Sequence, residues 1–276
     1  MAATLAPELP PKGFSFSNCL RNEHLTENGY PQPNITKTGT TIVGVVYKDG
    51  VILGSDTRAT GSNIVSDKNC EKLHYVAKRI YCAGAGTAAD CDRMTRMMQS
   101  QLAIHALNTG REPRVCTLTR MLKQYLYRYQ GMLGCALIVG GVDSIGPQVC
   151  SISPHGNTAT LPYATMGSGS LAAVAVLESQ WVPNMELDAA KKLVRDALAA
   201  GILNDMGSGS NVDLVVITQA GAQLLRPYEI IAKKTEHSVA YTYPKGATKV
   251  IEMKVVKFHT ENSVTRDVSD TEPMEM

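Results

Sequence analysis

From residue 41 onward, apolar residues recur in two patterns, one typical of strands and one typical of helices. Runs rich in β-branched residues at 41–47 and 51–57 flank Lys48-Asp49-Gly50, whose Asp-Gly pair favours a tight turn. These features predict a β-hairpin. The same criteria predict shorter strands at 72–76, 79–83, 136–140, 148–153, 158–162, 212–218 and 223–227, and they fit a further strand at 248–258.

The strand runs are interrupted twice, each time by two stretches whose apolar residues share one helical face. The first two stretches contain Met94, Met97, Met98 and Leu102, and then Leu118, Met121, Leu122, Tyr125, Leu126 and Tyr129. The second two are residues 170–180 and a helix containing Leu187, Ala190, Val194, Ala197 and Leu198. This order predicts a layered α+β body with sheets inside and helices outside. It does not fit a doubly wound parallel sheet, whose strands and helices alternate singly.

The first 39 residues lack both patterns. They contain five prolines and show no sustained helical or strand period, so they predict an extended segment outside the core. Two interpretations of this leader follow from the residues: a disordered segment, or a prosegment that is removed.

Composition excludes several classes of protein. The 276 residues include 27 Lys and Arg against 25 Asp and Glu, a formal net charge of +2, which argues against a nucleic-acid binder with a basic surface. No run of apolar residues is long enough to span a membrane. The N-terminus also lacks the charged and apolar segments of a secretory signal.

The seven cysteines are scattered and contain no C-x-x-C pair. An odd, dispersed set without a signal peptide predicts free thiols in a reducing compartment rather than disulfides. Without paired cysteines or an H-E-x-x-H motif, we expect no metal site.

The junction between the leader and the first strand, Lys37-Thr38-Gly39-Thr40-Thr41, is the strongest candidate for chemistry. If the chain is cut after Gly39, Thr40 gains a free α-amine with a reference pKa of about 8. Such an amine can accept the proton of its own threonine hydroxyl and so activate it as a nucleophile. Gly39 offers an unhindered carbonyl to Thr40, so the cut could be autocatalytic.

Two identical strings, Met166–Ser170 and Met206–Ser210, read Met-Gly-Ser-Gly-Ser. Neither continues into the Gly-Lys-Ser/Thr of a phosphate-binding loop, and neither is a G-x-S-x-G nucleophile elbow. They predict two tight turns at the ends of elements. Their serines could also orient a nearby polar group.

Several segments together resemble the catalytic beta subunits of the 20S proteasome, over essentially the whole chain. They are Gly39–Val45, Gly54–Thr60, Lys72, Gly84–Gly86 and Gly207–Gly209. The trypsin-like subtype is indicated by Gly13–Phe16 and Arg128–Gly131, and its inducible form, found in immunoproteasomes, by Arg111–Val115 and Ala220–Ala222. The resemblance implies the four-layer αββα sandwich of N-terminal-nucleophile hydrolases, with two antiparallel sheets between helix layers.

The resemblance also implies roles for individual residues. Thr40 would be the nucleophile, and Asp56 and Lys72 would form a buried ion pair beside it that favours the neutral amine and the developing alkoxide. The backbone N–H of Gly86 would form the oxyanion hole. Hydrogen bonds around the threonine amine would come from Ser168, Asp205 and Ser208.

The same resemblance implies a pocket for the residue before the cut. Gly84 would form its floor and leave it deep, and Asp92 would face it, so Lys and Arg side chains would be favoured. The other residues implied in substrate binding are Ala59, Thr60, Asp67, Cys70 and His74, with Asp67 in a neighbouring pocket.

At the level of the whole protein, the resemblance implies a zymogen with three parts. Residues 1–39 would be a propeptide, 40–230 the hydrolase domain, and 231–276 an extension contacting a neighbouring subunit. The subunit would act in stacked heteroheptameric rings with other alpha and beta subunits, in the cytoplasm and nucleus, on unfolded polypeptides and without a cofactor. Two alternatives are a non-catalytic structural ring subunit and a stand-alone amidohydrolase with an N-terminal nucleophile.

Overall fold

The structure, a computed structural model, describes residues 16–30, 38–61, 64–233, 246 and 249–258. The chain divides into two units, Met1–Lys234 and Thr235–Met276. The helices and strands of the described residues all belong to the first unit.

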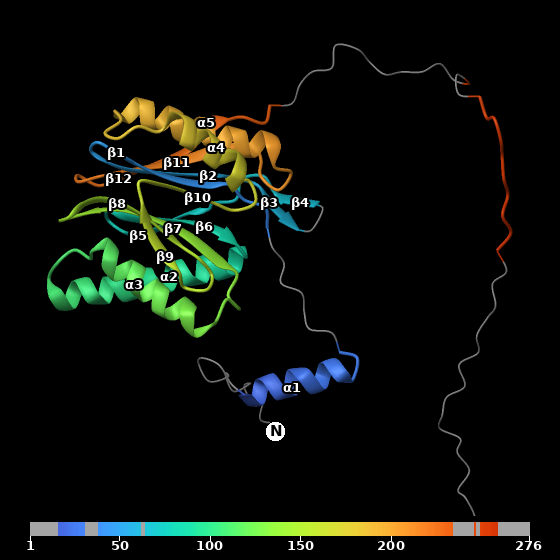
Figure 1. The fold of residues 1–276 in the computed structure, drawn as a ribbon, viewed down its shortest axis with the longest axis horizontal. Coiled ribbons are helices and arrows are strands. Elements are labelled where there is room, and N and C mark those ends of the chain that lie inside the picture. Colours follow the sequence, from blue (N-terminus) through green and yellow to red (C-terminus); the bar gives the residue numbers. More distant parts are fainter. Residues whose placement is uncertain (1–15, 31–37, 62–63, 234–245, 247–248, 259–276) are drawn as a thin grey trace, which may run out of the picture. The chain divides into compact units, whose positions relative to one another are not determined.

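Two five-stranded antiparallel sheets form the centre of the first unit (Figure 1). The first sheet has the order β10 (Tyr163–Met166), β1 (Ile42–Tyr47), β2 (Gly50–Asp56), β11 (Asn211–Thr218) and β12 (Ala222–Ile230). The second has the order β5 (Leu73–Ala77), β6 (Ile80–Gly86), β7 (Cys135–Asp143), β8 (Gly146–Ile152) and β9 (Thr158–Leu161). A separate two-stranded ribbon consists of β3 (Ala59–Gly61) and β4 (Ile64–Asp67).

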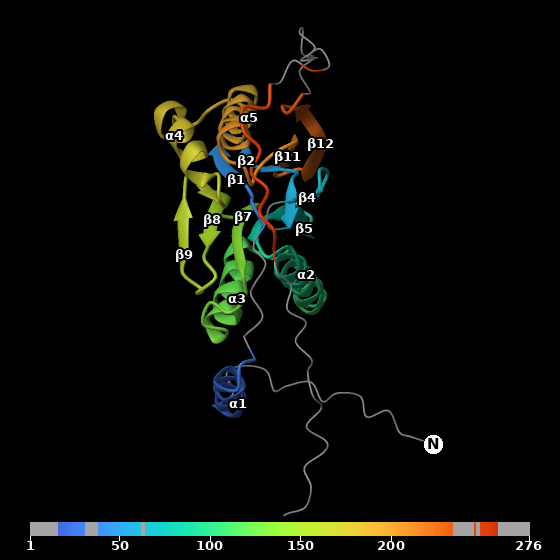
Figure 2. The same cartoon turned by 90° about the vertical axis from the view of Figure 1, so that its right-hand side faces the viewer.

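Helices cover the outer face of each sheet (Figures 1 and 2). The first sheet packs against α4 (Ser170–Gln180) and α5 (Leu187–Asn204), and the second against α2 (Ala88–Thr109) and α3 (Val115–Arg128). The predicted four-layer αββα sandwich is confirmed. Three buried apolar clusters fill its interfaces, one under each helix layer and one between the sheets.

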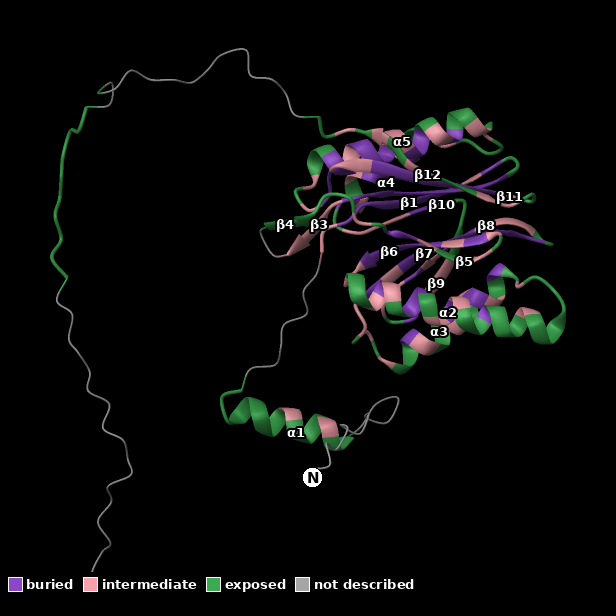
Figure 3. Cartoon of the chain, turned by 180° about the vertical axis from the view of Figure 1, so that it is seen from behind, coloured by how far each residue is buried: buried purple, intermediate pink, exposed green. Residues whose placement is uncertain are grey.

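The layer between the sheets is tightly packed, which explains why its strands carry nearly unbroken apolar runs. All seven residues of β2 are buried, and in Figure 3 buried residues are concentrated on the strands between the helix layers. A Cβ added at Gly44 of β1 would lie 2.8 Å from Ile138 and 2.9 Å from Leu53. Glycine therefore lets the two sheets approach closely here.

The predicted hairpin is confirmed as β1 and β2, whose register runs from Ile42 opposite Ser55 to Tyr47 opposite Gly50. The ribbon of β3 and β4, and strand β10, have no counterpart among the strands predicted from the sequence. The strand predicted at 158–162 ends at Leu161, because Pro162 lacks the N–H that a strand ladder requires. After it, the chain crosses from the second sheet to the first as β10.

Two predictions about the ends of the chain are wrong. The leader contains a helix, α1 (Phe16–Glu27), with no buried residue. Its five prolines lie outside this stretch, so the intervening residues are free to form backbone i→i+4 hydrogen bonds. Residues 249–258 form no strand, since a strand-like sequence needs a partner strand. Thr248, most of the leader and 259–276 lie outside the described residues.

Candidate active site

Thr40 lies two residues before β1 and is almost fully buried, with 2% of its surface exposed. Its backbone N–H donates to Ser168 Oγ at 3.0 Å, and its carbonyl accepts from the N–H of Gly169 at 3.2 Å. Both partners belong to the first Met-Gly-Ser-Gly-Ser string, which connects β10 to α4. Thr40 is therefore held from the backbone, and its side chain is left to other contacts.

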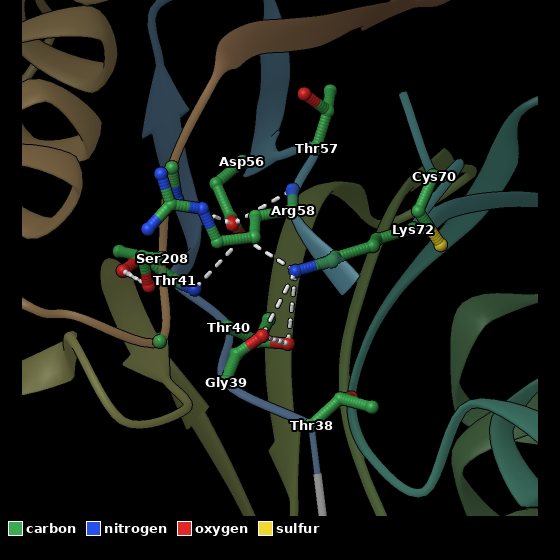
Figure 4. Close-up of polar contacts among 12 residues, drawn as sticks. Thr38, Gly39, Thr40, Thr41, Asp56, Thr57, Arg58, Cys70, Lys72 and Ser208 are labelled. Atoms are coloured by element: carbon green, nitrogen blue, oxygen red, sulfur yellow. Dashed lines mark hydrogen bonds and ion pairs between the residues drawn. The ribbon is translucent and has the colours of Figure 1, made fainter. Parts of the chain in front are cut away.

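Lys72 stands at the centre of the polar contacts around Thr40 (Figure 4). Its Nζ donates to Thr40 Oγ1 at 3.0 Å, to the carbonyl of Gly39 at 3.1 Å and to Asp56 Oδ1 at 2.8 Å. The ion pair is buried, with 7% of the lysine and none of the aspartate side chain exposed. A cation in this position favours negative charge on the hydroxyl oxygen or on the carbonyl oxygen.

The Asp56 carboxylate is satisfied by more than the lysine. Oδ1 also accepts the N–H of Thr41 at 2.9 Å, and Oδ2 accepts those of Arg58 at 3.2 Å and Gly209 at 3.1 Å. These three N–H donors and the lysine ammonium satisfy both oxygens of the buried carboxylate. It therefore fixes the position of the Lys72 ammonium between β2 and β5.

Asp205, the residue that ends α5, gathers the two serines of the site. Its Oδ2 accepts from Ser168 Oγ at 2.6 Å and from Ser208 Oγ at 2.7 Å, and Ser208 lies 2.6 Å from Thr41 Oγ1. Burial opposes the charge of Asp205. The two serine hydroxyls and the N–H groups of Gly207 and Ser208 outweigh burial and hold the pKa below its ordinary value.

Because the pKa of Asp205 is lowered, this group stays ionised throughout the range from pH 5 to 8. Asp205→Asn should therefore slow leader removal by a factor that is constant across that range. The loss should be about fivefold, since hydrogen bonds to a charged acceptor exceed neutral ones by about 1 kcal/mol. Processing rates from a pH series test this, with Asp196→Asn, a half-buried carboxylate paired with Arg195, as the control. A loss that varies with pH would contradict the ionised state.

The end of the leader lies in the site through its backbone. Gly39 N–H donates to Thr60 Oγ1 at 3.0 Å, and Thr38 donates through N–H and Oγ1 to the carbonyl of Gly86 at 3.4 and 2.8 Å. A Cβ at residue 39 would meet the backbone of Gly207 at 2.2 Å. Only glycine fits before Thr40 without a shift of this backbone.

Thr40 Oγ1 donates to the carbonyl oxygen of Gly39 at 2.7 Å. The candidate nucleophile thus donates a hydrogen bond to the carbonyl oxygen of the peptide bond that it is predicted to attack. The same carbonyl oxygen accepts a hydrogen bond from Lys72 Nζ. The candidate nucleophile and the lysine cation therefore both contact the peptide bond between Gly39 and Thr40.

Gly86 ends β6 with a φ of +115°, and a Cβ there would lie 2.2 Å from the carbonyl of Gly134. That carbonyl accepts the N–H of Thr87 at 2.7 Å, and Asp90 Oδ2 accepts the N–H of Gly134 at 2.9 Å. The conformation of Gly86 is therefore fixed by its neighbours. Its contact with the leader uses its carbonyl, and the oxyanion role of its N–H stays a prediction.

A pocket of about 190 Å³ opens beside Thr40. Five of the residues expected to bind substrate line it, and Glu71 and Cys91 line it although the sequence analysis did not single them out. The residues that line the pocket include Ala59, Cys70, Glu71, His74, Gly84 and Asp92. Thr60 instead contacts the leader, and Asp67 is exposed on β4, so its role in a neighbouring pocket stays a prediction.

Gly84 forms part of the floor, since a Cβ there would lie 3.1 Å from Cys91 Cβ and 3.4 Å from His74 Nε2. Burial lowers the pKa of His74 despite the nearby Asp92 carboxylate, and burial raises the pKa of the Cys70 thiol. Both side chains are therefore neutral near pH 7. The negative charge in the pocket comes from its carboxylates.

Each pocket carboxylate already has an arginine partner. Asp92 Oδ1 accepts from Arg96 at 2.8 Å, one turn away on α2, and Glu71 Oε2 accepts from Arg226 at 3.0 Å. The two arginines differ in exposure, 75% for Arg96 against 23% for Arg226. The Asp92 pair is thus an exposed i,i+4 contact of the kind that contributes little and exchanges readily.

Other kinds of site are not found among the described residues. They contain no cluster of three or more His, Cys, Asp or Glu that could hold a metal ion, and no helix long and apolar enough to cross a membrane. The seven cysteines are free, and four are buried.

The layered fold, with a threonine at the head of a central strand and a lysine beside its hydroxyl, defines an N-terminal-nucleophile hydrolase. A family model described as proteasome subunit matches residues 36–217. The chain belongs to the proteasome subunit family, as the sequence analysis predicted.

Relatives match over most of their length. Proteasome subunit beta type-10 of Bos taurus is 53% identical over 254 residues, 91% of this chain and 93% of that protein. Proteasome subunit beta type-7-B of Arabidopsis thaliana is 55% identical over 222 residues, 80% and 81% of the two chains. Proteasome subunit beta type-7 of Dictyostelium discoideum is 49% identical over 249 residues, 90% and 94%.

Proposed function

We propose that Thr40 cuts its own bond to Gly39 and then serves as the N-terminal nucleophile of a threonine endopeptidase. One observation carries this proposal: Thr40 Oγ1 lies within hydrogen-bond distance of both the Gly39 carbonyl oxygen and Lys72 Nζ, at 2.7 and 3.0 Å. The contact with the buried Lys72, 32 residues away, is the one that a surface threonine would lack. Residues 1–39 then act as a propeptide that keeps the amine blocked.

The first reaction is an acyl shift. Thr40 Oγ1 forms a bond to the carbonyl carbon of Gly39, the carbon–nitrogen bond breaks, and the hydroxyl proton ends on the released amine. Water then hydrolyses the resulting ester, which frees the Gly39 carboxyl group, the Thr40 hydroxyl and the Thr40 amine. The Lys72 ammonium, 3.1 Å from the Gly39 oxygen, stabilises the negative charge that develops there.

The second reaction repeats this chemistry on a substrate peptide. The freed amine of Thr40 accepts the hydroxyl proton, as its reference pKa of about 8 allows. In the uncut chain, the Ser168 hydroxyl accepts a hydrogen bond from the Thr40 N–H at 3.0 Å. After the cut, the same hydroxyl orients the freed amine. The acyl-enzyme is released by water, with no metal or cofactor in the scheme.

The specificity is trypsin-like, for basic residues before the cut, and Asp92 is the carboxylate that receives them. Its pair with Arg96 is exposed and within one helix, so a substrate cation can replace that arginine at little cost. Glu71 is held by the more buried Arg226. The neutral His74 does not repel the incoming charge.

Gly84→Val is expected to raise the KM for a peptide ending in arginine by tenfold or more, because the branched side chain fills the pocket floor beside Cys91. Leader removal should be unaffected, since Gly39 has no side chain to place in that pocket. Peptide kinetics and the mass of the chain are measured on the same sample. Unchanged KM would show that the pocket is misplaced, and a retained leader would show that the variant disturbs more than the floor.

The protein works as a subunit of a proteasome, in stacked heteroheptameric rings with other alpha and beta subunits. The assembly acts on unfolded polypeptides in the cytoplasm and nucleus. The type-10 relatives fit the inducible form that the sequence favours. Residues 231–276 form an extension that contacts a neighbouring subunit. Among its described residues, Ile251, Met253 and Phe258 are highly exposed, as expected of a segment that awaits a partner.

The intact mass and N-terminal sequence of the chain, taken from its assembly, test the proposal. A chain that begins at Thr40 supports it. A chain that begins at Met1 or within the leader would favour the alternative of a structural ring subunit. Activity of the chain alone, outside the assembly, would favour a stand-alone amidohydrolase.

A further inference from the structure

A second buried carboxylate lies beside the catalytic group and takes no part in the chemistry described above. Asp213 of β11 is 1% exposed and stands opposite Ser55 in the register, next to the pair formed by Val212 and Asp56. Its Oδ2 lies 2.9 Å from Nε of Arg226, on the neighbouring strand β12. A carboxylate this deep is costly to keep charged unless it is paired.

Arg226 uses its other edge on the segment that leads into β5. Its Nη1 donates to Glu71 Oε2 at 3.0 Å, and its Nη2 donates to the carbonyl of Asn69. Cys70 and Glu71 line the substrate pocket, and the next residue is Lys72. One guanidinium therefore connects the first sheet to the segment that carries the catalytic lysine of the second sheet.

The two ends of this contact have different consequences. Burial raises the pKa of Asp213 to about 6 even beside an arginine, so the pair adds little to stability, as buried pairs often do. The charge attraction across the 2.9 Å between Asp213 Oδ2 and Arg226 Nε, which lacks hydrogen-bond geometry, draws the guanidinium toward β11, and its two Nη atoms reach Glu71 and Asn69. Among the described residues that line the pocket, Glu71 and Asp92 are the two that carry a carboxylate.

We propose that Arg226, held by Asp213, is a positioning residue with two effects. It holds the Asn69–Lys72 segment at the active site, and it keeps the Glu71 carboxylate from binding the substrate cation as a second acidic residue in the pocket. The inference rests on the proposed function, because it acts through Lys72 and through the basic specificity of the pocket. It assigns the recognition of the substrate cation to Asp92 alone.

Removal of the guanidinium has a distinctive kinetic signature. Arg226→Met should lower kcat on an arginine-ended peptide by about fivefold, the size expected for one lost charge-assisted hydrogen bond, because Lys72 loses part of its support. KM should stay the same or fall, because the freed Glu71 attracts the substrate cation. Adding Glu71→Gln should abolish any fall in KM and leave the loss of kcat.

The variants are assembled with the partner subunits, and rates are divided by the number of processed chains counted by mass. Arg195→Met is the matched control, since Arg195 also forms an ion pair with a β12 carboxylate, Glu229 at 2.7 Å. It should leave kcat and KM unchanged. Asp213→Asn keeps the shape of the anchor and should change kcat in the same direction, with no further loss when combined with Arg226→Met.

Unchanged kcat and KM per processed chain in both Arg226→Met and Asp213→Asn would overturn the proposal, even if their melting temperatures fell, because a purely structural pair would give that result. A KM that rises in Arg226→Met would also overturn it. Failure of the proposed function is seen separately, as cleavage of the arginine-ended peptide by the Thr40→Ala chain.

Discussion

Thr40→Ala is expected to leave the leader attached and to abolish cleavage after basic residues by this subunit. The variant lacks the oxygen that contacts the Gly39 carbonyl at 2.7 Å, so the acyl shift has no nucleophile. Loss of the nucleophile in another hydrolase lowers kcat by about a millionfold, and a loss on that order is expected here. Intact mass reports the leader, and hydrolysis of an arginine-ended peptide reports the activity.

Two controls separate the roles of Thr40. Thr40→Ser keeps the hydroxyl and should retain both processing and cleavage. A Thr40→Ala chain produced with residue 40 as its first residue has a free amine but no hydroxyl, and it should be inactive without any leader. Residual arginine-directed cleavage by that chain would sink the threonine mechanism.

Lys72→Ala is expected to slow both leader removal and peptide cleavage by about a hundred- to a thousandfold, the range for loss of one group that stabilises a developing oxyanion. The variant removes the cation from both the Thr40 hydroxyl and the Gly39 carbonyl. Asp56 keeps three backbone donors, so the chain should still fold. Thermal unfolding checks the fold, and processing is followed by mass.

Lys48→Ala is the matched control for this variant. Lys48 also forms a 2.9 Å ion pair, with Glu186, but that pair is exposed and should contribute little. Its processing and activity should match those of the unchanged chain. Normal leader removal in Lys72→Ala would exclude the lysine from the mechanism.

Much of the fold could be predicted because the apolar residues of the chain show clear strand and helix periodicity. The β1–β2 hairpin follows from two apolar runs around Asp49-Gly50, and the paired helices follow from one-sided apolar stripes. Predictions failed where the outcome depended on partners. Residues 249–258, rich in valine and other apolar residues, form no strand, and β10 is a strand because β1 lies beside it.

The candidate site divides in the same way. Thr40, Asp56 and Lys72 were predicted from motif resemblance, and the structure brings Lys72 within hydrogen-bond distance of both Thr40 and Asp56. Glu71 and Arg226 were not predicted, since nothing in their local sequence relates residues 155 positions apart. Their contact exists because β12 at the edge of one sheet passes the segment that enters the other.

The sequence by itself determined the local features: which stretches form strands, where the four helices that cover the sheets run, and that a glycine and a threonine stand just before a buried strand. Only the tertiary structure decided which charges meet. It brings the Lys72 ammonium between Asp56 and Thr40, leaves Asp92 with an exposed partner, and turns Arg226 toward Asp213 and Glu71. The physical reason is that burial and distance set the strength of the interaction between two charges. Both are fixed only when the two sheets pack against each other.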